Sequence, residues 1–252
     1  MDATTRDTLA KVPAVTLVFW IIKVFATTLG ETGGDAVSMS MNLGYLTATG
    51  IFAVLFIAAV WAQVVAKGFH PVLYWVTILA TTMLGTTLAD FADRSLGIGY
   101  PGGSSLLLGL LLASLFAWHR TLGSIDVNTV SSPASEGFYW MTIMFSQTLG
   151  TALGDWMADT QGMGYLGSAV VFGGLLVLLA LAYKFTKVSH TALFWAAFIL
   201  TRPLGAVVGD LLDKPIDHGG FALSRYTASF VLLAVIAALI AFVPQRAASR
   251  VH

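Results

Sequence analysis

The sequence predicts an all-α polytopic membrane protein in which eight transmembrane helices form four parallel two-helix repeats around a pseudo-fourfold axis normal to the membrane. Its composition, its long apolar runs and a fourfold repeated motif lead to this fold class. Of its 252 residues, 57% are hydrophobic and 10% are charged, whereas ordinary soluble domains have about 25% charged residues. A soluble fold of this size would leave too much apolar surface in water. We therefore expect the chain to lie in a bilayer.

Eight apolar runs are each close to the ~20 residues that a helix needs to cross the hydrocarbon core of a membrane. They cover residues 13–34, 45–66, 71–91, 104–119, 138–157, 165–184, 191–211 and 223–243. The fourth run is short, so its helix is expected to begin a few residues earlier. Because no small-residue cleavage site follows a short apolar core near the start, the first run is expected to remain in the protein.

The distribution of Lys and Arg predicts that both ends of the chain lie in the cytoplasm. Eight basic residues fall at one end of the predicted helices and three at the other, and the side richer in Lys and Arg is normally cytoplasmic. The three on the poorer side are Arg94, Lys214 and Arg225, and eight aspartates accompany them. The external face is therefore expected to be acidic.

A motif of Trp, Gly and Asp recurs four times along the chain at fixed offsets. Counted from Trp20, Trp75, Trp140 and Trp195, a Gly falls ten residues later, an Asp fifteen residues later and a second Gly twenty-four residues later in every copy. The copies cover about residues 12–66, 67–120, 132–186 and 187–243 of a single membrane domain, residues 1–252. Since each copy has two spans, all four share one orientation and their axis is normal to the membrane, unlike the in-plane axis of inverted repeats. The motif helices are expected inside and the plainer helices outside, against lipid.

These residues resemble a family of bacterial membrane proteins made of four tandem copies of a two-span repeat with a characteristic Trp, catalogued as a repeat of unknown function. The resemblance covers residues 12–243, and the aromatic–Trp pair with Gly and Asp at these offsets carries it. It implies an eight-span, multi-pass protein of the bacterial inner (cytoplasmic) membrane, described as uncharacterised and membrane-anchored. It implies no activity.

Small residues at plus ten and plus fourteen are expected to let the helix backbones approach closely in lipid. They are Gly30 and Gly34, Gly85 and Ala89, Gly150 and Gly154, and Gly205 and Gly209. Positions plus three, seven, eleven and fifteen lie along one side of the same helices and are largely polar. Polar residues inside a membrane normally face a bundle interior or a wet cavity, so this axial stripe is expected to face the axis. Before its last position the stripe contains Lys23, Thr27, Glu31, Thr82, Thr86, Gln147, Thr151 and Arg202.

The stripe ends in Asp35, Asp90, Asp155 and Asp210. These aspartates lie near the C-terminal ends of outward-running helices, where the helix dipole already places partial negative charge. Four carboxylates there would repel one another unless a cation lay among them. We therefore predict an external cation vestibule in which these four aspartates bind a metal ion, with three more aspartates nearby. Those three are Asp93, Asp159 and Asp213. The alternative is that each Asp merely accepts hydrogen bonds from a loop or caps an adjacent helix.

Lys23, Glu31 and Arg202 break the pattern of the stripe. Arg202 stands where the other copies have Thr or Gln, and an Arg that faces the axis would pair most simply with Glu31. Lys23 lies one to two turns away and would compete for that carboxylate. The three residues form either a gate or proton-coupled switch, or a static buried pair that fixes the packing, because buried ion pairs are weak evidence for motion.

The oxygen-rich set of side chains favours a hard cation. Carboxylates, Thr hydroxyls and the Gln147 amide suit Mg²⁺, Ca²⁺ or Mn²⁺. We therefore expect a transporter of a small cation, with a Mn- or Mg-like divalent metal as the first candidate and proton-coupled export as one form of it. The alternatives are a non-transporting scaffold or sensor, and a carrier of a small organic anion held by Arg202 or Lys23.

Other function classes are disfavoured. The 13 basic and 13 acidic residues cancel and the chain has no Cys, so it lacks the positive field that nucleic acid needs and any thiolate metal site. No nucleophile with a base, phosphate loop or paired-His motif is present, so neither an enzyme nor a cofactor is expected. The expected partners are the lipid bilayer and a small cation, with the oligomeric state left open. A continuous cavity from the aspartates inward would be the clearest sign of a transport path.

Overall fold

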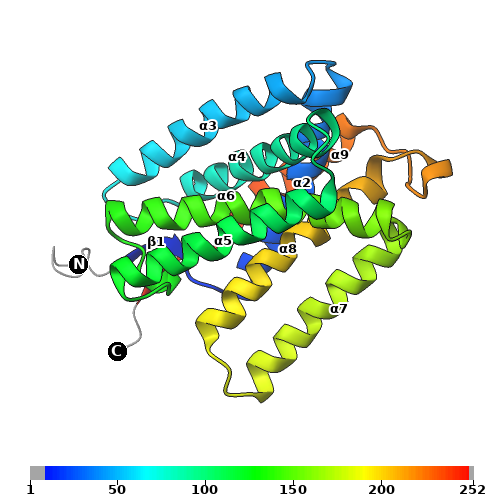
Figure 1. The fold of residues 1–252 in the computed structure, drawn as a ribbon. Helices are drawn as coiled ribbons and strands as arrows, with labels where there is room; N and C mark the ends of the chain where they lie inside the picture. The colour runs from blue at the N-terminus through cyan, green and yellow to red at the C-terminus, as the bar shows by residue number, and fades with distance from the viewer. Residues whose placement is uncertain (1–8, 250–252) are drawn as a thin grey trace.

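The computed structural model describes residues 9–249 and is almost entirely helical (Figure 1). Four helices carry the repeated motif: α2 (Leu17–Asp35), α4 (Pro71–Asp90), α6 (Pro133–Asp155) and α8 (His190–Asp213). Each is followed by a plainer helix: α3 (Tyr45–Val65), α5 (Tyr100–Leu122), α7 (Gly164–Phe185) and α9 (Arg225–Phe242). The expectation of an all-helical fold with two helices per repeat is confirmed, and the fourth run does begin earlier, at Tyr100.

Short elements connect these helices. Three π-helical turns follow the motif helices: η1 (Ala36–Ser40), η2 (Phe91–Ser95) and η4 (Trp156–Thr160). Two 3₁₀ turns, η3 (Val127–Thr129) and η5 (Ile216–His218), lie in the connection between the two halves and in the loop between α8 and α9. The fourth repeat has no π-helical turn after its motif Asp, since α8 continues three residues further, to Asp213.

The motif helices begin at polar caps. Thr16, His70, Ser132 and Ser189 each accept a hydrogen bond from a backbone N–H of the first turn. Such a side chain satisfies one of the N–H groups that a helix start leaves without a partner. Pro71 and Pro133 occupy the first helical position, where the missing N–H of proline costs nothing.

The second Gly of the motif, at plus twenty-four, lies where the chain turns back after each motif helix. Gly44, Gly99, Gly164 and Gly219 have φ values of 76°, 76°, 66° and 83°. Only glycine adopts this left-handed conformation without a steric penalty. The repetition of Gly at this offset therefore reports a positive φ in all four repeats, although ψ is 160° at Gly44 and 150° at Gly99 but 11° at Gly219.

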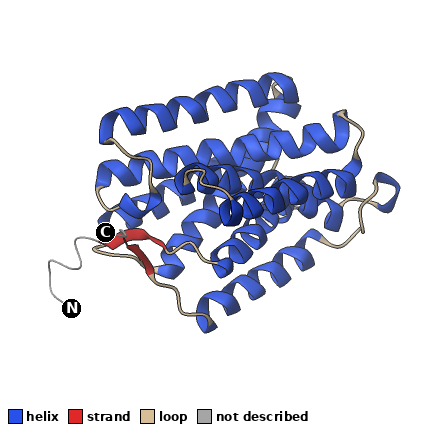
Figure 2. Cartoon of the chain, turned by 90° about the horizontal axis from the view of Figure 1, so that it is seen from below, coloured by secondary structure: helices blue, strands red, loops and turns tan. Residues whose placement is uncertain are grey.

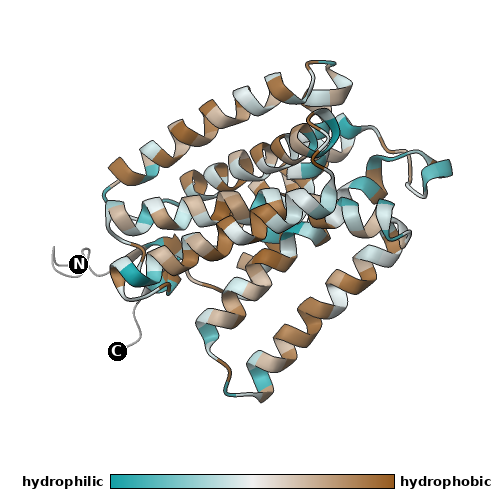
Figure 3. Cartoon of the chain, viewed as in Figure 1, coloured by the Kyte–Doolittle hydropathy of each residue, from teal (hydrophilic) through white to brown (hydrophobic). Residues whose placement is uncertain are grey.

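The four motif helices form a closed inner ring. α2 packs on α4 and α8, and α6 packs on the same two helices from the opposite side. Each plain helix packs on the motif helix of the following repeat: α3 on α4, α5 on α6 and α7 on α8, while α9 closes on α2. The outer helices are strongly apolar along their length (Figure 3), and large side chains such as Val54, Val170 and Phe230 are about 70% exposed on them.

The glycines at plus ten set the distance between neighbours in this ring. A Cβ atom on Gly30, Gly85, Gly150 or Gly205 would collide with the residue at plus seven of the next repeat: Thr82, Gln147, Arg202 and Thr27 respectively. Three of the small residues at plus fourteen are also in close contact with the next repeat: Gly34 lies against Thr86, Gly154 against Ala206 and Gly209 against Glu31. The packing role expected of the small residues thus has a structural basis in close backbone approach.

Six helices of the described chain are long and apolar enough to cross a membrane: α3, α4, α5, α7, α8 and α9. This is the pattern of a multi-pass membrane protein. The two that fall short of that apolarity, α2 and α6, are members of the inner ring and are covered by the others. Within α2, Lys23, Glu31 and Asp35 are all buried by neighbouring helices.

Two short strands at one end of the bundle were not predicted. β1 (Leu9–Pro13) pairs antiparallel with β2 (Ala247–Ser249), so the two ends of the described chain lie together (Figure 2). The first helix therefore begins at Leu17 rather than at residue 13. Lys11 fastens β1 to the bundle: its Nζ atom is 2.7 Å from Glu136 Oε1 and donates hydrogen bonds to the carbonyls of Gln63 and Val64 at the end of α3.

Candidate functional site

The four motif aspartates lie at the end of the inner ring that is opposite the β-ribbon. Asp35, Asp90 and Asp155 are the last residues of their α-helices, and Asp210 is three residues from the end of α8. Each of the four is at most 2% exposed. We call this set the outer acidic tier. Three of its members are followed at once by a π-helical turn, a local widening that is frequent at functional sites.

Two basic side chains divide the outer acidic tier into two pairs. Arg94 lies with its Nε 3.1 Å from Asp90 Oδ1 and its Nη2 3.1 Å from Asp155 Oδ2. Lys214 Nζ is 2.9 Å from Asp35 Oδ2 and 3.0 Å from Asp210 Oδ1. Each cation therefore binds the Asp of its own repeat, four residues earlier, and the Asp of the next repeat around the ring.

Sequence reasoning placed Arg94 and Lys214 on the external side but did not assign them to the site. The signal was present at plus nineteen from the motif Trp, where the four repeats have Met39, Arg94, Asp159 and Lys214. A basic residue one turn after the aspartate occurs in alternate repeats only. This alternation gives the ring of four motif helices a twofold pattern of charge.

Lys214 lies just beyond the end of α8, among carboxylates. Burial by itself lowers the pKa of the ammonium, but the negative charges of Asp210, Asp35 and Asp213 outweigh burial and raise the pKa of Lys214 above its usual value. The neighbouring carboxylates therefore favour the charged form of Lys214, which competes with any other cation for Asp35 and Asp210.

Glu31, Asp35 and Asp210 form the group best placed to hold a metal ion. Each offers one carboxylate oxygen, and these oxygens lie within 4.8 Å of one another. All three side chains are at most 3% exposed, and Asp35 Oδ1 has no hydrogen-bond partner among the described residues. Of the four aspartates predicted to share one ion, the structure thus brings Asp35 and Asp210 together with Glu31, while Asp90 and Asp155 share Arg94.

The other three aspartates of the predicted vestibule differ in their environments. Asp213 is buried and accepts a hydrogen bond of 2.9 Å from Arg225 Nε. Asp93 is half-buried against α5, where a Cβ on Gly103 would collide with its Oδ1. Asp159 is exposed. Among these three, Asp213 alone is tied to the outer acidic tier, because Arg225 also lies 3.6 Å from Asp35 Oδ2.

One turn below the aspartates, the guanidinium of Arg202 lies between four helices. Its Nη2 is 3.0 Å from Glu31 Oε2 on α2 and 2.6 Å from Thr86 Oγ1 on α4, and it also donates to Thr151 Oγ1 on α6. Arg202 is fully buried. The pairing expected for an axial Arg202 is therefore present. We call Arg202, Glu31, Thr86 and Thr151 the Arg202 tier; it closes the centre of the ring.

The residues at plus seven are used mainly between neighbouring helices. Thr27 Oγ1 donates to the Thr201 carbonyl at 3.1 Å, and Thr82 Oγ1 donates to the Ala26 carbonyl at 3.4 Å. Gln147 is fully buried, yet neither its amide oxygen nor its amide nitrogen has a hydrogen-bond partner in the described part of the chain. Thr27 and Thr82 therefore stabilise the ring, whereas Gln147 does not take part in such a contact.

Deeper in the ring, the plus-three positions are apolar except for Lys23. Ile78, Ile143 and Phe198 are fully buried there. Lys23 is equally buried, its Nζ lies 4.2 Å from the centre of the Phe198 ring, and it has no hydrogen-bond partner within residues 9–249. Lys23 does not contact Glu31 in this structure, so the competition expected between Lys23 and Arg202 is not seen in this conformation.

An aromatic cluster fills the ring next to the β-ribbon. Trp75, Trp140 and Trp195 are at most 3% exposed, and the Tyr74 and Tyr139 hydroxyls lie 2.6 Å apart. Trp75 Nε1 donates to Gln245 Oε1 and Trp195 Nε1 donates to the Ile125 carbonyl. The aromatic rings therefore close this end of the axis and join it to the terminal segments and to the connection between the halves.

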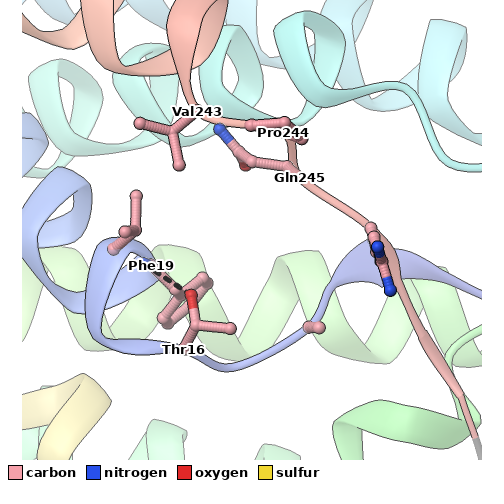
Figure 4. A pocket seen from close by; sticks show the side chains of 8 residues that line it. Thr16, Phe19, Val243, Pro244 and Gln245 are labelled. Atoms are coloured by element: carbon pink, nitrogen blue, oxygen red, sulfur yellow. Dashed lines mark hydrogen bonds between the residues drawn. The ribbon is translucent and has the colours of Figure 1, made fainter.

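The two main pockets of the described chain lie away from the axis. One is on the outer face of α2, lined by Trp20, Ile21, Val24 and Phe25. The other lies where the chain enters α2 and leaves α9; Thr16 and Phe19 line one wall, and residues 243–246 line the other (Figure 4). Neither joins the aspartates to the level of Arg202, so in this conformation they provide no continuous path along the ring.

The comparisons with known proteins agree with the repeat. The family model described as Repeat of Unknown Function (DUF347) matches residues 18–69, 73–124, 138–189 and 193–244. Each match begins two residues before a motif Trp, which confirms the resemblance seen in the sequence. No curated protein and no solved structure matches this chain.

Proposed function

Since the chain belongs to the DUF347 repeat family, whose description carries no activity, we propose a function from the geometry: a membrane transporter of a small, hard cation. Glu31, Asp35 and Asp210 would bind the cation, most simply a divalent ion such as Mn²⁺ or Mg²⁺. The observation that carries the proposal is the convergence of these three buried carboxylates, whose oxygens lie within 4.8 Å of one another. Oxygen donors of this kind suit hard divalent ions.

The balance of buried charge around the outer acidic tier supports a divalent ligand. Six buried carboxylates gather there: Glu31, Asp35, Asp90, Asp155, Asp210 and Asp213. The basic side chains paired with them are four: Arg94, Arg202, Lys214 and Arg225. Ionised carboxylates would leave two negative charges without a counter-ion, and uncompensated buried charge is costly. Two protons or one divalent cation would supply the difference, which is the basis for proton-coupled exchange.

Lys214 supplies a way to release the cation. Its ammonium already contacts Asp35 and Asp210 at 2.9 and 3.0 Å, as a metal ion would. It follows α8 on the loop side, and its side chain remains 13% exposed. A metal ion that entered from that side would displace Lys214, and the return of Lys214 would expel it.

The proposal includes the membrane arrangement. We place all eight helices across the bilayer, with α2 and α6 shielded inside the ring, the repeats related by a pseudo-fourfold axis normal to the membrane, and both termini in the cytoplasm. The excess of Lys and Arg at the β-ribbon end supports this orientation. The outer acidic tier then faces the outside of a bacterial inner membrane.

A non-transporting scaffold or sensor is the second candidate, and the closed axis favours it. The Arg202 tier and the aromatic cluster both fill the ring. In this alternative, metal binding at the outer acidic tier would be read out by a partner protein, without movement of the ion across the membrane.

Uptake of Mn²⁺, Mg²⁺ or Ca²⁺ into proteoliposomes containing the purified full chain tests the proposal. The transporter predicts protein-dependent flux that falls about tenfold or more in Asp35→Asn and Asp210→Asn, by analogy with the loss caused by disturbing metal-site residues. The matched control is Asp159→Asn, an exposed carboxylate of the same region, which should keep the wild-type rate. Metal binding without flux would leave the sensor as the function, and no binding of any of the three ions would reject both.

A further inference from the structure

Three fully buried side chains of the axial stripe present hydrogen-bond donors without acceptors. They are Lys23 on α2, Gln147 on α6 and Arg202 on α8, each 0% exposed. Lys23 Nζ, Gln147 Nε2, and both Nε and Nη1 of Arg202 have no hydrogen-bond partner in the part of the chain that the structure describes. A buried donor without an acceptor costs about 1–3 kcal/mol, and more when it is charged, so several together in one place call for an explanation.

The three side chains stand at two adjacent levels of the axial stripe, Lys23 at plus three and Gln147 and Arg202 at plus seven. Lys23 Nζ lies 4.2 Å from the centre of the Phe198 ring, and Phe198 precedes Arg202 by one turn on the same side of α8. The Arg202 stem lies against α6 at Gly150, where a Cβ would collide with its Cβ and Cγ. Gly150 is less than one turn beyond Gln147 on that helix. Three different helices of the ring therefore carry donors without partners within about one helical turn of one another.

Basic side chains outnumber carboxylates at these levels, in contrast to the outer acidic tier. Glu31 is the carboxylate that pairs with Arg202, and Lys23 pairs with no carboxylate among residues 9–249. The plus-three residues beside Lys23 are Ile78, Ile143 and Phe198, which cannot solvate an ammonium. Water molecules would satisfy the donors but would not balance the charge of a protonated Lys23.

We propose that Lys23, Gln147 and Arg202 form a binding site for a small monovalent anion. Its chemistry follows from three buried donor groups, two of them on basic side chains, with Glu31 paired to Arg202 alone. Its size limit follows from the packing, because the neighbouring Ile78, Ile143 and Phe198 are fully buried. The expected ligand is therefore a compact ion of halide size rather than a large organic anion. The proposal is independent of cation transport, since it uses none of the aspartates.

Thermal unfolding of the full chain in detergent tests this site, with sodium bromide compared with sodium gluconate at the same sodium concentration. Bromide should raise the melting temperature by about 5 °C or more at a hundredfold excess over its dissociation constant, and gluconate should not. In Lys23→Ile the bromide effect should vanish. This variant should fold, because the second and third repeats have Ile78 and Ile143 at the same position.

Controls separate this proposal from the previous one. Lys187→Ala removes an exposed lysine and should keep the full bromide effect, as should Asp35→Asn, which disables the cation site. Line broadening of the chloride NMR signal by wild-type protein, lost in Lys23→Ile, gives a direct binding readout. Equal melting temperatures in bromide and gluconate, as expected for a deprotonated Lys23 amine, would overturn the proposal. So would a bromide effect that persists in Lys23→Ile.

Discussion

The contact between Arg202 and Glu31 offers a sharp test of how the ring is closed. Arg202 Nη2 lies 3.0 Å from Glu31 Oε2, and the two residues are 0% and 3% exposed. The second and third repeats show how the same positions are filled without charge, with Thr86 and Thr151 at plus eleven and Gln147 at plus seven. Three variants follow from this comparison: Glu31→Thr, Arg202→Gln and the double variant.

The magnitudes follow from burial. Removing one member of a buried pair leaves an uncompensated charge and costs about 3–5 kcal/mol. For a chain of this length, this corresponds to a fall in melting temperature of about 2–4 °C per kcal/mol. The loss in Glu31→Thr should lie at the lower end of this range of about 3–5 kcal/mol, because Arg202 keeps its contacts with two threonines. The double variant removes both charges, so it should lose no more than either single variant. The coupling energy should then be about 3 kcal/mol.

The assay is unfolding of the detergent-solubilised chain by heat and by denaturant, followed through tryptophan fluorescence. Arg120→Gln, which changes an exposed arginine at the end of α5, is the control and should leave the melting temperature within about 2 °C of wild type. Strictly additive losses in the double variant would refute the reasoning, because they would mean that the two side chains do not share one buried site.

Two further changes test the packing and the closed end. Gly205→Ala places a Cβ within 2.5 Å of Thr27 Cβ and 2.7 Å of its backbone carbon, so it should lower the free energy of unfolding by about 1–3 kcal/mol. Gly109→Ala is the control: open space surrounds Gly109, so this change should raise the free energy of unfolding by about 0.5–1 kcal/mol. If both variants shifted the melting temperature in the same direction, the close approach of the helices at Gly205 would be contradicted. Lys11→Met breaks the 2.7 Å contact with Glu136. It should lower the free energy of unfolding by about 2 kcal/mol and speed proteolysis of the terminal segments. Unchanged cleavage would show that Lys11 does not hold the β-ribbon.

Much of the fold was predictable because the repeat records local requirements. The apolar runs gave the helices, and only their ends differed, as at Leu17 and Tyr100. The Gly at plus ten and the Gly at plus twenty-four each have a single backbone reason, close approach in one case and positive φ in the other. The placement of the motif helices inside and the plain helices outside was likewise expected from four units of equal orientation.

The partners of the charged residues were predicted less well. The pairing of Glu31 with Arg202 was predicted because both residues break the repeat. The four aspartates, in contrast, were predicted to form one equivalent set. Arg94 and Lys214 were left outside the site, and neither the β-ribbon nor the contact of Lys11 with Glu136 was predicted.

The sequence by itself determined the number and polarity of the helices, their small-residue contacts and the level of each polar residue along them, because spacing along a helix converts directly into height and side. The tertiary structure alone decided that Arg94 joins Asp90 to Asp155, that Lys214 joins Asp35 to Asp210, and that Lys23 remains without a carboxylate. Such choices depend on how far a long side chain reaches across the gap between two helices, and a difference of a few ångströms there selects the partner.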